Sequence, residues 1–195
     1  MDYDEKTALV IVDVQNDFAD PSGNLYVREG EAIVEIINDE IEKAAAARGT
    51  IVYTQDWHPE RTPHFEIDGG IWPVHCVQDS WGAEFHPGLK IVGDVVRKGT
   101  GGEDGYSGFS VRDPASGAQA ETGLHEMLRA KGIEKVVVVG LATDYCVKET
   151  ALDAIAKGFD TTVLGDAVRA VDLQPGDGTA ALESIRLGGA NVVDG

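Results

Sequence analysis

The chain has 195 residues, 43% of them hydrophobic, which suits a single domain over residues 1–195 with a sizeable core. Its formal net charge of −18 argues against nucleic acid or an anionic membrane as a partner, because both attract basic surfaces. The charged start and the lack of a long apolar run predict no leader peptide or membrane span, and two cysteines are too few for a disulfide framework, so we expect a cytoplasmic protein.

The first part of the chain predicts a βαβ unit. Residues 8–12 form a continuous apolar run, which is typical of a strand buried on both faces. Glycines and a proline should keep the polar stretch 13–30 non-helical. Apolar residues then recur at helical spacing over 31–48, and a second apolar strand follows at 50–54.

Residues 57–90 show no clear periodicity, so we expect a long loop, and loops of this length are usually functional or disordered. A short strand is expected within 91–96 and an amphipathic helix over 121–131. Between them, the glycine-rich stretch 99–109 lacks the spacing of a phosphate-binding loop, which argues against a nucleotide cofactor.

Four consecutive valines, 136–139, predict a central strand of a parallel sheet. The chain should then enter a helix that ends near Gly158, with Thr143 or Asp144 as its N-cap. Cys146 would lie in the first helical turn, where free backbone N–H groups and the helix dipole favour a thiolate. A small buried core cysteine is the alternative interpretation.

A strand at 161–164, a helix at 179–187 and an edge strand at 191–193 complete the alternation. Alternating strands and helices predict an α/β fold, with a doubly wound, mostly parallel six-stranded sheet and helices on both faces. Ligands of such sheets bind beyond the carboxyl ends of the strands.

Four chemically useful residues follow predicted strands and could converge at that edge of the sheet: Asp13, Asp56, Lys98 and Cys146. A lysine beside the cysteine favours the thiolate, a carboxylate can carry a proton, and backbone amides can hold an oxyanion. Taken singly, Asp13 is also typical of a turn and Lys98 of a solvated surface.

Histidines gather in the long loop. Asp56 and His58 are one residue apart, so their side chains lie on the same side of an extended segment. Folding of the loop could bring His64 and His75 to them. Carboxylate and imidazole ligands together suit zinc, iron or manganese. Alternatively, the three histidines are surface polar residues.

Several segments resemble nicotinamidases of the isochorismatase-like hydrolase superfamily. The segments are 13–18, 56–58, 64–65, 72–76, 98–99 and 140–147. The Asp, Lys and Cys pattern is typical of the superfamily. The Asp-x-His pair with two later histidines is typical of its metal-binding nicotinamidase branch.

The resemblance implies an amidase that hydrolyses nicotinamide, a small-molecule substrate, to nicotinate and ammonia through a cysteine thioester, in NAD salvage. Cys146 would attack the carboxamide carbon, Asp13 would move the proton, and Lys98 would favour the charged forms of both. A cis peptide bond at Leu141–Ala142 would aim the backbone amides of Ala142 and Cys146 at the developing oxyanion.

By the same resemblance, one divalent metal ion would orient the substrate. Its ligands would be Asp56, His58, His64 and His75. The pocket would have aromatic walls suited to a pyridine ring, formed by Phe18, Trp72, Tyr106 and Tyr145. Ordinary packing is the alternative for Phe18 and Trp72, and Tyr145 would bear on substrate shape.

Three functions stay open at this point. The first is a nicotinamidase. The second is another hydrolase of the superfamily, an isochorismatase or a carbamoyl amidase, which would not need the metal ligands. The third is a catalytically silent relative that only binds, although intact Asp13, Lys98 and Cys146 speak against it. The identity of the metal and the formation of a homo-oligomer also stay open.

Overall fold

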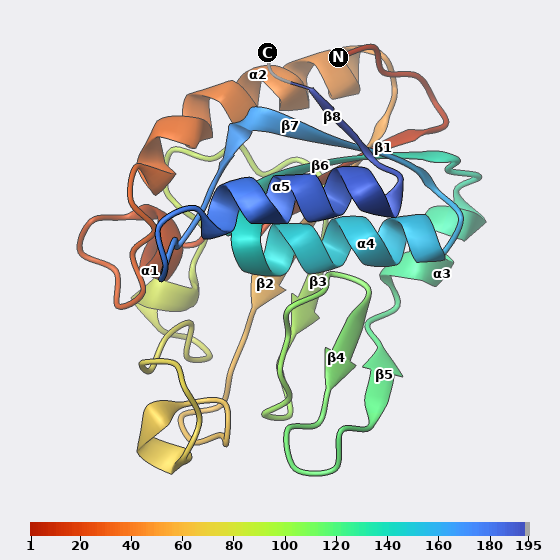
Figure 1. The fold of residues 1–195 in the computed structure, drawn as a ribbon. Coiled ribbons are helices and arrows are strands. Elements are labelled where there is room, and N and C mark those ends of the chain that lie inside the picture. Colours follow the sequence, from red (N-terminus) through yellow and green to blue (C-terminus); the bar gives the residue numbers. More distant parts are fainter. Residues whose placement is uncertain (194–195) are drawn as a thin grey trace.

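The computed structural model describes residues 1–193 and confirms the predicted parallel sheet. Six strands lie in the order β3-β2-β1-β6-β7-β8, and every neighbouring pair is parallel (Figure 1). The strands are β1 (Thr7–Val12), β2 (Thr50–Asp56), β3 (Asp94–Lys98), β6 (Lys135–Leu141), β7 (Asp160–Arg169) and β8 (Asn191–Val193). The two most apolar runs, β1 and β6, therefore lie side by side in the middle of the sheet.

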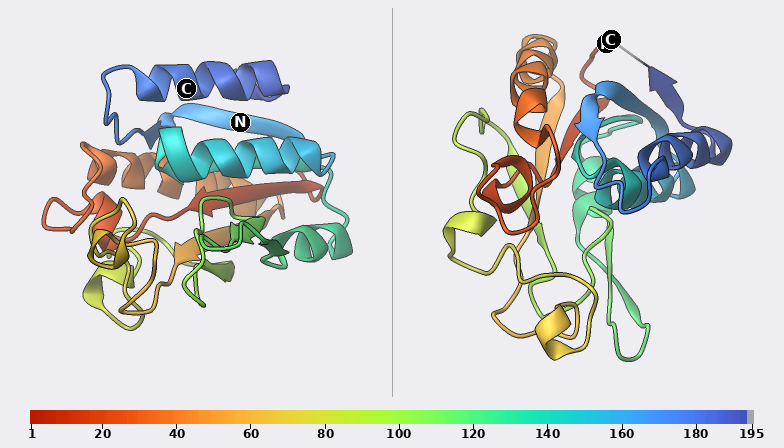
Figure 2. Two further views of the ribbon diagram at one scale, coloured as in Figure 1. Left: turned by 60° about the horizontal axis from the view of Figure 1, so that its bottom comes forward. Right: turned by 60° about the vertical axis from the view of Figure 1, so that its left-hand side comes forward.

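Helices cover both faces of the sheet, as Figure 2 shows. One face is covered by α2 (Ile33–Ala46), and the other by α3 (Leu124–Ala130), α4 (Lys148–Ala156) and α5 (Asp177–Gly188). Alternate residues of a strand point to opposite faces, so Leu9 belongs to the core under α2 while Val10 belongs to the core under α4. Burial of both faces explains why the inner strands β1 and β6 are continuous apolar runs rather than alternating ones.

Two local expectations about helices are wrong. The stretch 13–30 contains the short helix α1 (Asn16–Ala19), because the backbone N–H groups of Phe18 and Ala19 bond back to the Gln15 carbonyl. A 3-10 helix, η1 (Gly30–Ala32), leads from this stretch into α2. The helix expected over 121–131 begins only at Leu124. Residues before it form β5 (Gln119–Glu121), which pairs antiparallel with β4 (Ser110–Arg112) in a hairpin that was not predicted.

The entry into α4 also differs from the expectation. The chain passes through a π-helix, η4 (Thr143–Val147), and neither Thr143 nor Asp144 caps it. The Asp144 carboxylate instead accepts the backbone N–H groups of Val171 and Asp172, at 3.0 and 2.9 Å. This aspartate therefore fixes the loop after β7. Strand β7 is longer than the predicted 161–164, because a register shift against β6 lets it continue to Arg169.

The long loop after β2 lacks regular structure except for two 3-10 helices, η2 (Glu66–Asp68) and η3 (Trp81–Ala83). In Figure 1 the η2 part of this loop and the β4–β5 hairpin extend away from the sheet in the same direction. Among residues 1–193, no helix combines the length and the apolar character needed to cross a membrane.

Candidate functional site

The carboxyl ends of four strands bring together the four residues that end or follow them. Asp13 follows β1, Asp56 ends β2, Lys98 ends β3, and Cys146 lies in η4 after β6. The Lys98 ammonium lies 2.8 Å from Asp13 Oδ2 and 3.7 Å from the Cys146 sulfur. It also donates hydrogen bonds to Asp56 Oδ1 and to the Gly105 carbonyl. One cation therefore contacts the thiol and both carboxylates.

Burial decides the charge states in this group, because Lys98 is only 1% exposed. Burial alone would lower the pKa of the Lys98 ammonium, but Asp13 and Asp56 outweigh it and hold that pKa well above its usual value. For Asp13, burial is the stronger influence and raises the pKa despite the neighbouring Lys98. Burial also acts to raise the pKa of Asp56, but Lys98 and His58 outweigh it and hold the pKa below its usual value.

The Cys146 thiol differs from the expectation drawn from its place in the chain. Burial raises the pKa of the thiol well above its usual value, and the carboxylates of Asp13 and Asp56 add to the rise while Lys98 opposes it. Two buried carboxylates already share one ammonium, so a thiolate would add an unbalanced negative charge. Cys146 therefore rests as a thiol, and its nucleophilicity requires a base nearby.

Asp13 is held so that its two carboxylate oxygens have different partners. Its backbone lies in the left-handed region, with φ 50°, which is rare for a residue other than glycine and is typical of functional sites. The Thr54 hydroxyl donates to Asp13 Oδ1 at 2.6 Å, so Oδ2 is the oxygen that faces Lys98. Sequence reasoning missed Thr54, although its place two residues before Asp56 puts both on one side of β2.

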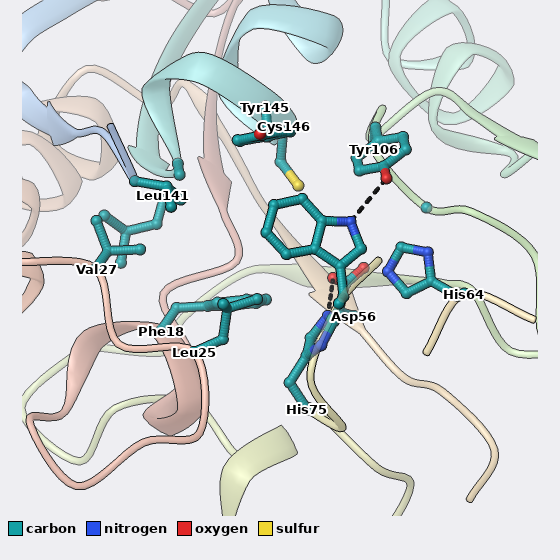
Figure 3. A pocket seen from close by; sticks show the side chains of 14 residues that line it. Phe18, Leu25, Val27, Asp56, His64, His75, Tyr106, Leu141, Tyr145 and Cys146 are labelled. Atoms are coloured by element: carbon teal, nitrogen blue, oxygen red, sulfur yellow. Dashed lines mark hydrogen bonds and ion pairs between the residues drawn. The ribbon is translucent and has the colours of Figure 1, made fainter. Parts of the chain in front are cut away.

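A pocket opens above the Cys146 sulfur. Figure 3 shows the sulfur pointing into it, with His64 and His75 on one side and Leu141 on the other. Ala142 also lines the pocket, and the peptide bond Leu141–Ala142 is cis, as the resemblance implies. Sequence reasoning missed three apolar wall residues, which lie in segments without a motif: Leu25, Val27 and Val171.

Aromatic side chains form much of the pocket wall. All four expected residues line it: Phe18, Trp72, Tyr106 and Tyr145. The Trp72 indole N–H donates to the Tyr106 hydroxyl at 2.8 Å, and the Trp72 ring meets Tyr145 edge-on at 4.8 Å. Burial raises the pKa of Tyr106 to about 12, so this phenol is neutral at physiological pH. The wall is flat, apolar and suited to a small aromatic ring.

The three histidines of the loop converge on Asp56 at one side of this pocket. Ring nitrogens of His58, His64 and His75 lie within 4.8 Å of one another, and all three side chains are buried. Asp56 Oδ2 lies 3.7 Å from His58 Nε2 and 3.9 Å from His75 Nε2. The interpretation of these histidines as surface residues is therefore wrong.

The hydrogen bonds of the histidines fit a bound metal ion. His64 Nδ1 lies 2.7 Å from Asp104 Oδ1, and His75 Nδ1 lies 2.7 Å from the Pro73 carbonyl, which leaves Nε2 of each ring as the ligand atom. Both ring nitrogens of His58 are buried without a hydrogen-bond partner among the described residues, an arrangement that costs free energy unless an ion is bound. Burial lowers the pKa of His75 to about 4, so that ring is neutral, as a metal ligand must be.

The chain is similar to known proteins over nearly its whole length. The sequence model of the isochorismatase domain matches residues 7–195. A nicotinamidase of Escherichia coli (strain K12) is 36% identical over 95% of this chain and 93% of that protein. The structure of PnC1 from L. infantum in complex with nicotinate has a TM-score of 0.88 at 36% identity, covering 100% of this chain and 96% of that one. The pyrazinamidase of Pyrococcus horikoshii in complex with zinc has a TM-score of 0.85 at 39% identity, covering 97% and 99%.

Proposed function

The chain belongs to the isochorismatase domain family, and we propose that it is a single-domain nicotinamidase, which hydrolyses nicotinamide to nicotinate and ammonia in NAD salvage. One observation carries this proposal: a buried thiol, carboxylate and ammonium lie together below an aromatic pocket. A similar protein that is a nicotinamidase, and the similar PnC1 structure solved with nicotinate, support the choice of substrate.

The first step is attack by Cys146 on the carboxamide carbon. Asp13 Oδ2 takes the thiol proton as the carbon–sulfur bond forms, because the thiol does not ionise by itself in this buried place. The raised pKa of Asp13 suits this role, since a base works best when its pKa approaches the working pH. Lys98 stays charged throughout and stabilises the negative charge that moves between sulfur and carboxylate.

The carboxamide oxygen gains negative charge in the same step. Backbone N–H groups of Ala142 and Cys146, at the wall of the pocket, would hold this oxyanion. Asp13 then returns the proton to the departing nitrogen, ammonia leaves, and the nicotinoyl group stays on sulfur as a thioester. Asp13 next takes a proton from water, whose oxygen attacks the thioester. The carbon–sulfur bond then breaks, and Asp13 returns that proton to the departing sulfur, so that nicotinate is released and the Cys146 thiol is restored.

Asp56, His58, His64 and His75 would hold one divalent metal ion. When bound, the ion supplies a Lewis-acid site that orients the pyridine end of the substrate. One carboxylate and three imidazoles suit zinc, iron or manganese, and the zinc complex of the Pyrococcus horikoshii pyrazinamidase supports a metal here. Phe18, in the wall next to His75, would contact the substrate ring.

We further propose the cytoplasm as the site of action. Both cysteines are free thiols in the structure, which suits a reducing compartment. Formation of a homo-oligomer stays a prediction.

The proposal is tested by ammonia release from nicotinamide. Wild-type protein should release ammonia, and Cys146→Ala and Asp13→Ala should lose essentially all turnover while their circular dichroism spectra stay unchanged. Metal analysis of protein purified without chelator separates this function from that of another superfamily hydrolase. A metal-free protein that remains fully active would contradict a nicotinamidase, and a wild type without any turnover would indicate a silent relative.

A further inference from the structure

Asp104 contacts the histidine cluster but has no part in the chemistry described above. Its Oδ1 lies 2.7 Å from His64 Nδ1, and the side chains of Asp104 and His64 are 18% and 5% exposed. The contact differs from those of the other two rings, because His75 Nδ1 meets a backbone carbonyl and His58 Nδ1 has no hydrogen-bond partner among the described residues. His64 is therefore the histidine of the cluster that is bound by a carboxylate through Nδ1.

The β4–β5 hairpin fixes the backbone of Asp104. The Asp104 N–H donates to the carbonyl of Arg112 at 2.8 Å, and the Arg112 N–H donates back to the carbonyl of Asp104 at 2.9 Å. Arg112 is the last residue of β4. The hairpin, which contributes no side chain to the catalytic group, thus sets where the Asp104 carboxylate lies.

His64 is tied to the same loop at a second point. The Thr62 hydroxyl donates to the Gly102 carbonyl at 2.6 Å and accepts the backbone N–H of His64 at 3.1 Å. The ring and the backbone of His64 are therefore both held by contacts that lead to the 99–109 loop. A histidine held in this way presents Nε2 in one direction only.

Three consecutive residues of that loop each contact a different part of the site. Asp104 binds His64, the Gly105 carbonyl accepts from Lys98, and the Tyr106 hydroxyl accepts from Trp72. A carboxylate at the first of these positions is thus part of an ordered arrangement rather than a solvated surface charge.

We propose that Asp104 is a positioning residue for the metal site: it accepts the Nδ1–H of His64 and so presents the unprotonated Nε2 to the ion. This inference rests on the proposed metal-dependent function. A carboxylate in that position fixes the tautomer and the orientation of a ligating imidazole, and its loss typically lowers metal affinity about 10–100-fold. Asp104 itself is not a ligand in this arrangement.

The experiment measures zinc affinity of the full chain by competition with a chromophoric chelator, with zinc alone as the probe. Asp104→Ala should bind zinc about 10–100-fold more weakly than wild type. Asp104→Asn should lose less, because its amide oxygen can still accept the Nδ1–H. Glu103→Gln is the matched control, because it removes one negative charge from the residue adjacent to Asp104. The Glu103 carboxylate accepts the Gly101 N–H and not a histidine, so this variant should leave the zinc affinity unchanged.

A His64→Ala background shows whether Asp104 acts through His64. In that background Asp104→Ala should cause no further loss of affinity. Equal zinc affinity of Asp104→Ala and wild type would overturn the inference, and so would a further loss in the His64→Ala background, because Asp104 would then act by charge or as a direct ligand. If Asp104→Ala fails to fold, Asp104→Asn serves in both backgrounds. If the wild type binds no zinc, the proposed metal site itself is contradicted. This result differs from failure of the Asp104 inference, in which the wild type binds zinc and Asp104→Ala binds it equally well.

Discussion

The carboxylate of Asp56 accepts a hydrogen bond from the Lys98 ammonium through Oδ1, while its Oδ2 faces the histidines. A single buried side chain therefore joins the cation beside the nucleophile to the metal ligands. A change at Asp56 should alter both parts of the site, whereas a change at His75 should alter the metal site alone.

Asp56→Asn and His75→Asn test this division. Both should bind zinc more weakly, because each lacks one ligand. In chelator-treated protein, Asp56→Asn should also make Cys146 react faster with an alkylating reagent at neutral pH, because the Asp56 charge is one cause of the raised thiol pKa after burial. Alkylation of Cys146 is followed by mass spectrometry. Equal alkylation rates in the two variants would show that Asp56 does not act on the thiol.

Lys98→Met should destabilise the fold as well as abolish turnover. The substitution leaves two carboxylates buried near each other without their cation, and breaking a buried ion pair typically costs about 3–5 kcal/mol. Lys131→Met is the control, since Lys131 pairs with Asp94 at an exposed surface, where an ion pair contributes about 1 kcal/mol or less. Urea denaturation measures both, and similar free energies of unfolding for the two variants would contradict the central role of Lys98.

Thr54 should control the acidic limit of activity. Asp13 must be ionised to take the thiol proton, so activity falls as the pH drops through its pKa. Burial raises that pKa, and Lys98 and the Thr54 hydroxyl oppose the rise. Thr54→Val removes a hydrogen bond that favours the charged carboxylate and should therefore move the acidic limb of kcat/KM to higher pH.

Thr54→Ser keeps the hydroxyl and should keep the acidic limb of the wild type. KM should change little in both variants, because Thr54 lies below the pocket rather than in its wall. An acidic limb of Thr54→Val that coincides with that of Thr54→Ser would show that the hydroxyl has no influence on Asp13.

Gly99 should be required for the position of His58. Its φ is +73°, and a Cβ atom there would lie 2.4 Å from His58 Cε1. Gly99→Ala should therefore displace the His58 ring and weaken zinc binding. Gly132→Ala is the control: its φ of +71° gives a similar backbone strain, but a Cβ atom there would meet no other atom within 4 Å. Both variants should lose stability, about 1–2 kcal/mol from the backbone, and equal zinc affinities would contradict the prediction.

The catalytic group could be predicted from the sequence because parallel strands end at one edge of their sheet. Buried apolar runs locate β1, β2 and β6, a short valine pair indicates β3, and the polar residues that end or follow these strands must then lie near one another. The charge state of Cys146 could not be predicted in this way. Its position near a helix start is a local feature, whereas its burial and the two carboxylates beside it depend on the whole fold.

The histidine cluster and its support were predictable only in part. Spacing relates Asp56 to His58, but the long loop carries no periodicity that places His64 or His75. Strands β4 and β5 are three residues each and largely exposed, so no apolar alternation indicates them. Because the hairpin could not be predicted, nothing in the sequence indicated that Asp104 contacts His64, forty positions away.

Removal of the metal should weaken substrate binding more than it slows the chemical step. The metal ligands lie at one side of the pocket, while Asp13, Lys98 and Cys146 hold one another through contacts that need no ion. Chelator-treated protein should therefore show a larger rise in KM for nicotinamide than fall in kcat, and added zinc, iron or manganese should reverse the change. The His125→Asn variant is treated in the same way as a control for loss of a histidine outside the cluster. The His125 ring packs edge-on against Phe159, so this variant should bind metal, and respond to chelator, as the wild type does. A loss of kcat with unchanged KM would mean that the ion takes part in the reaction rather than in holding the substrate.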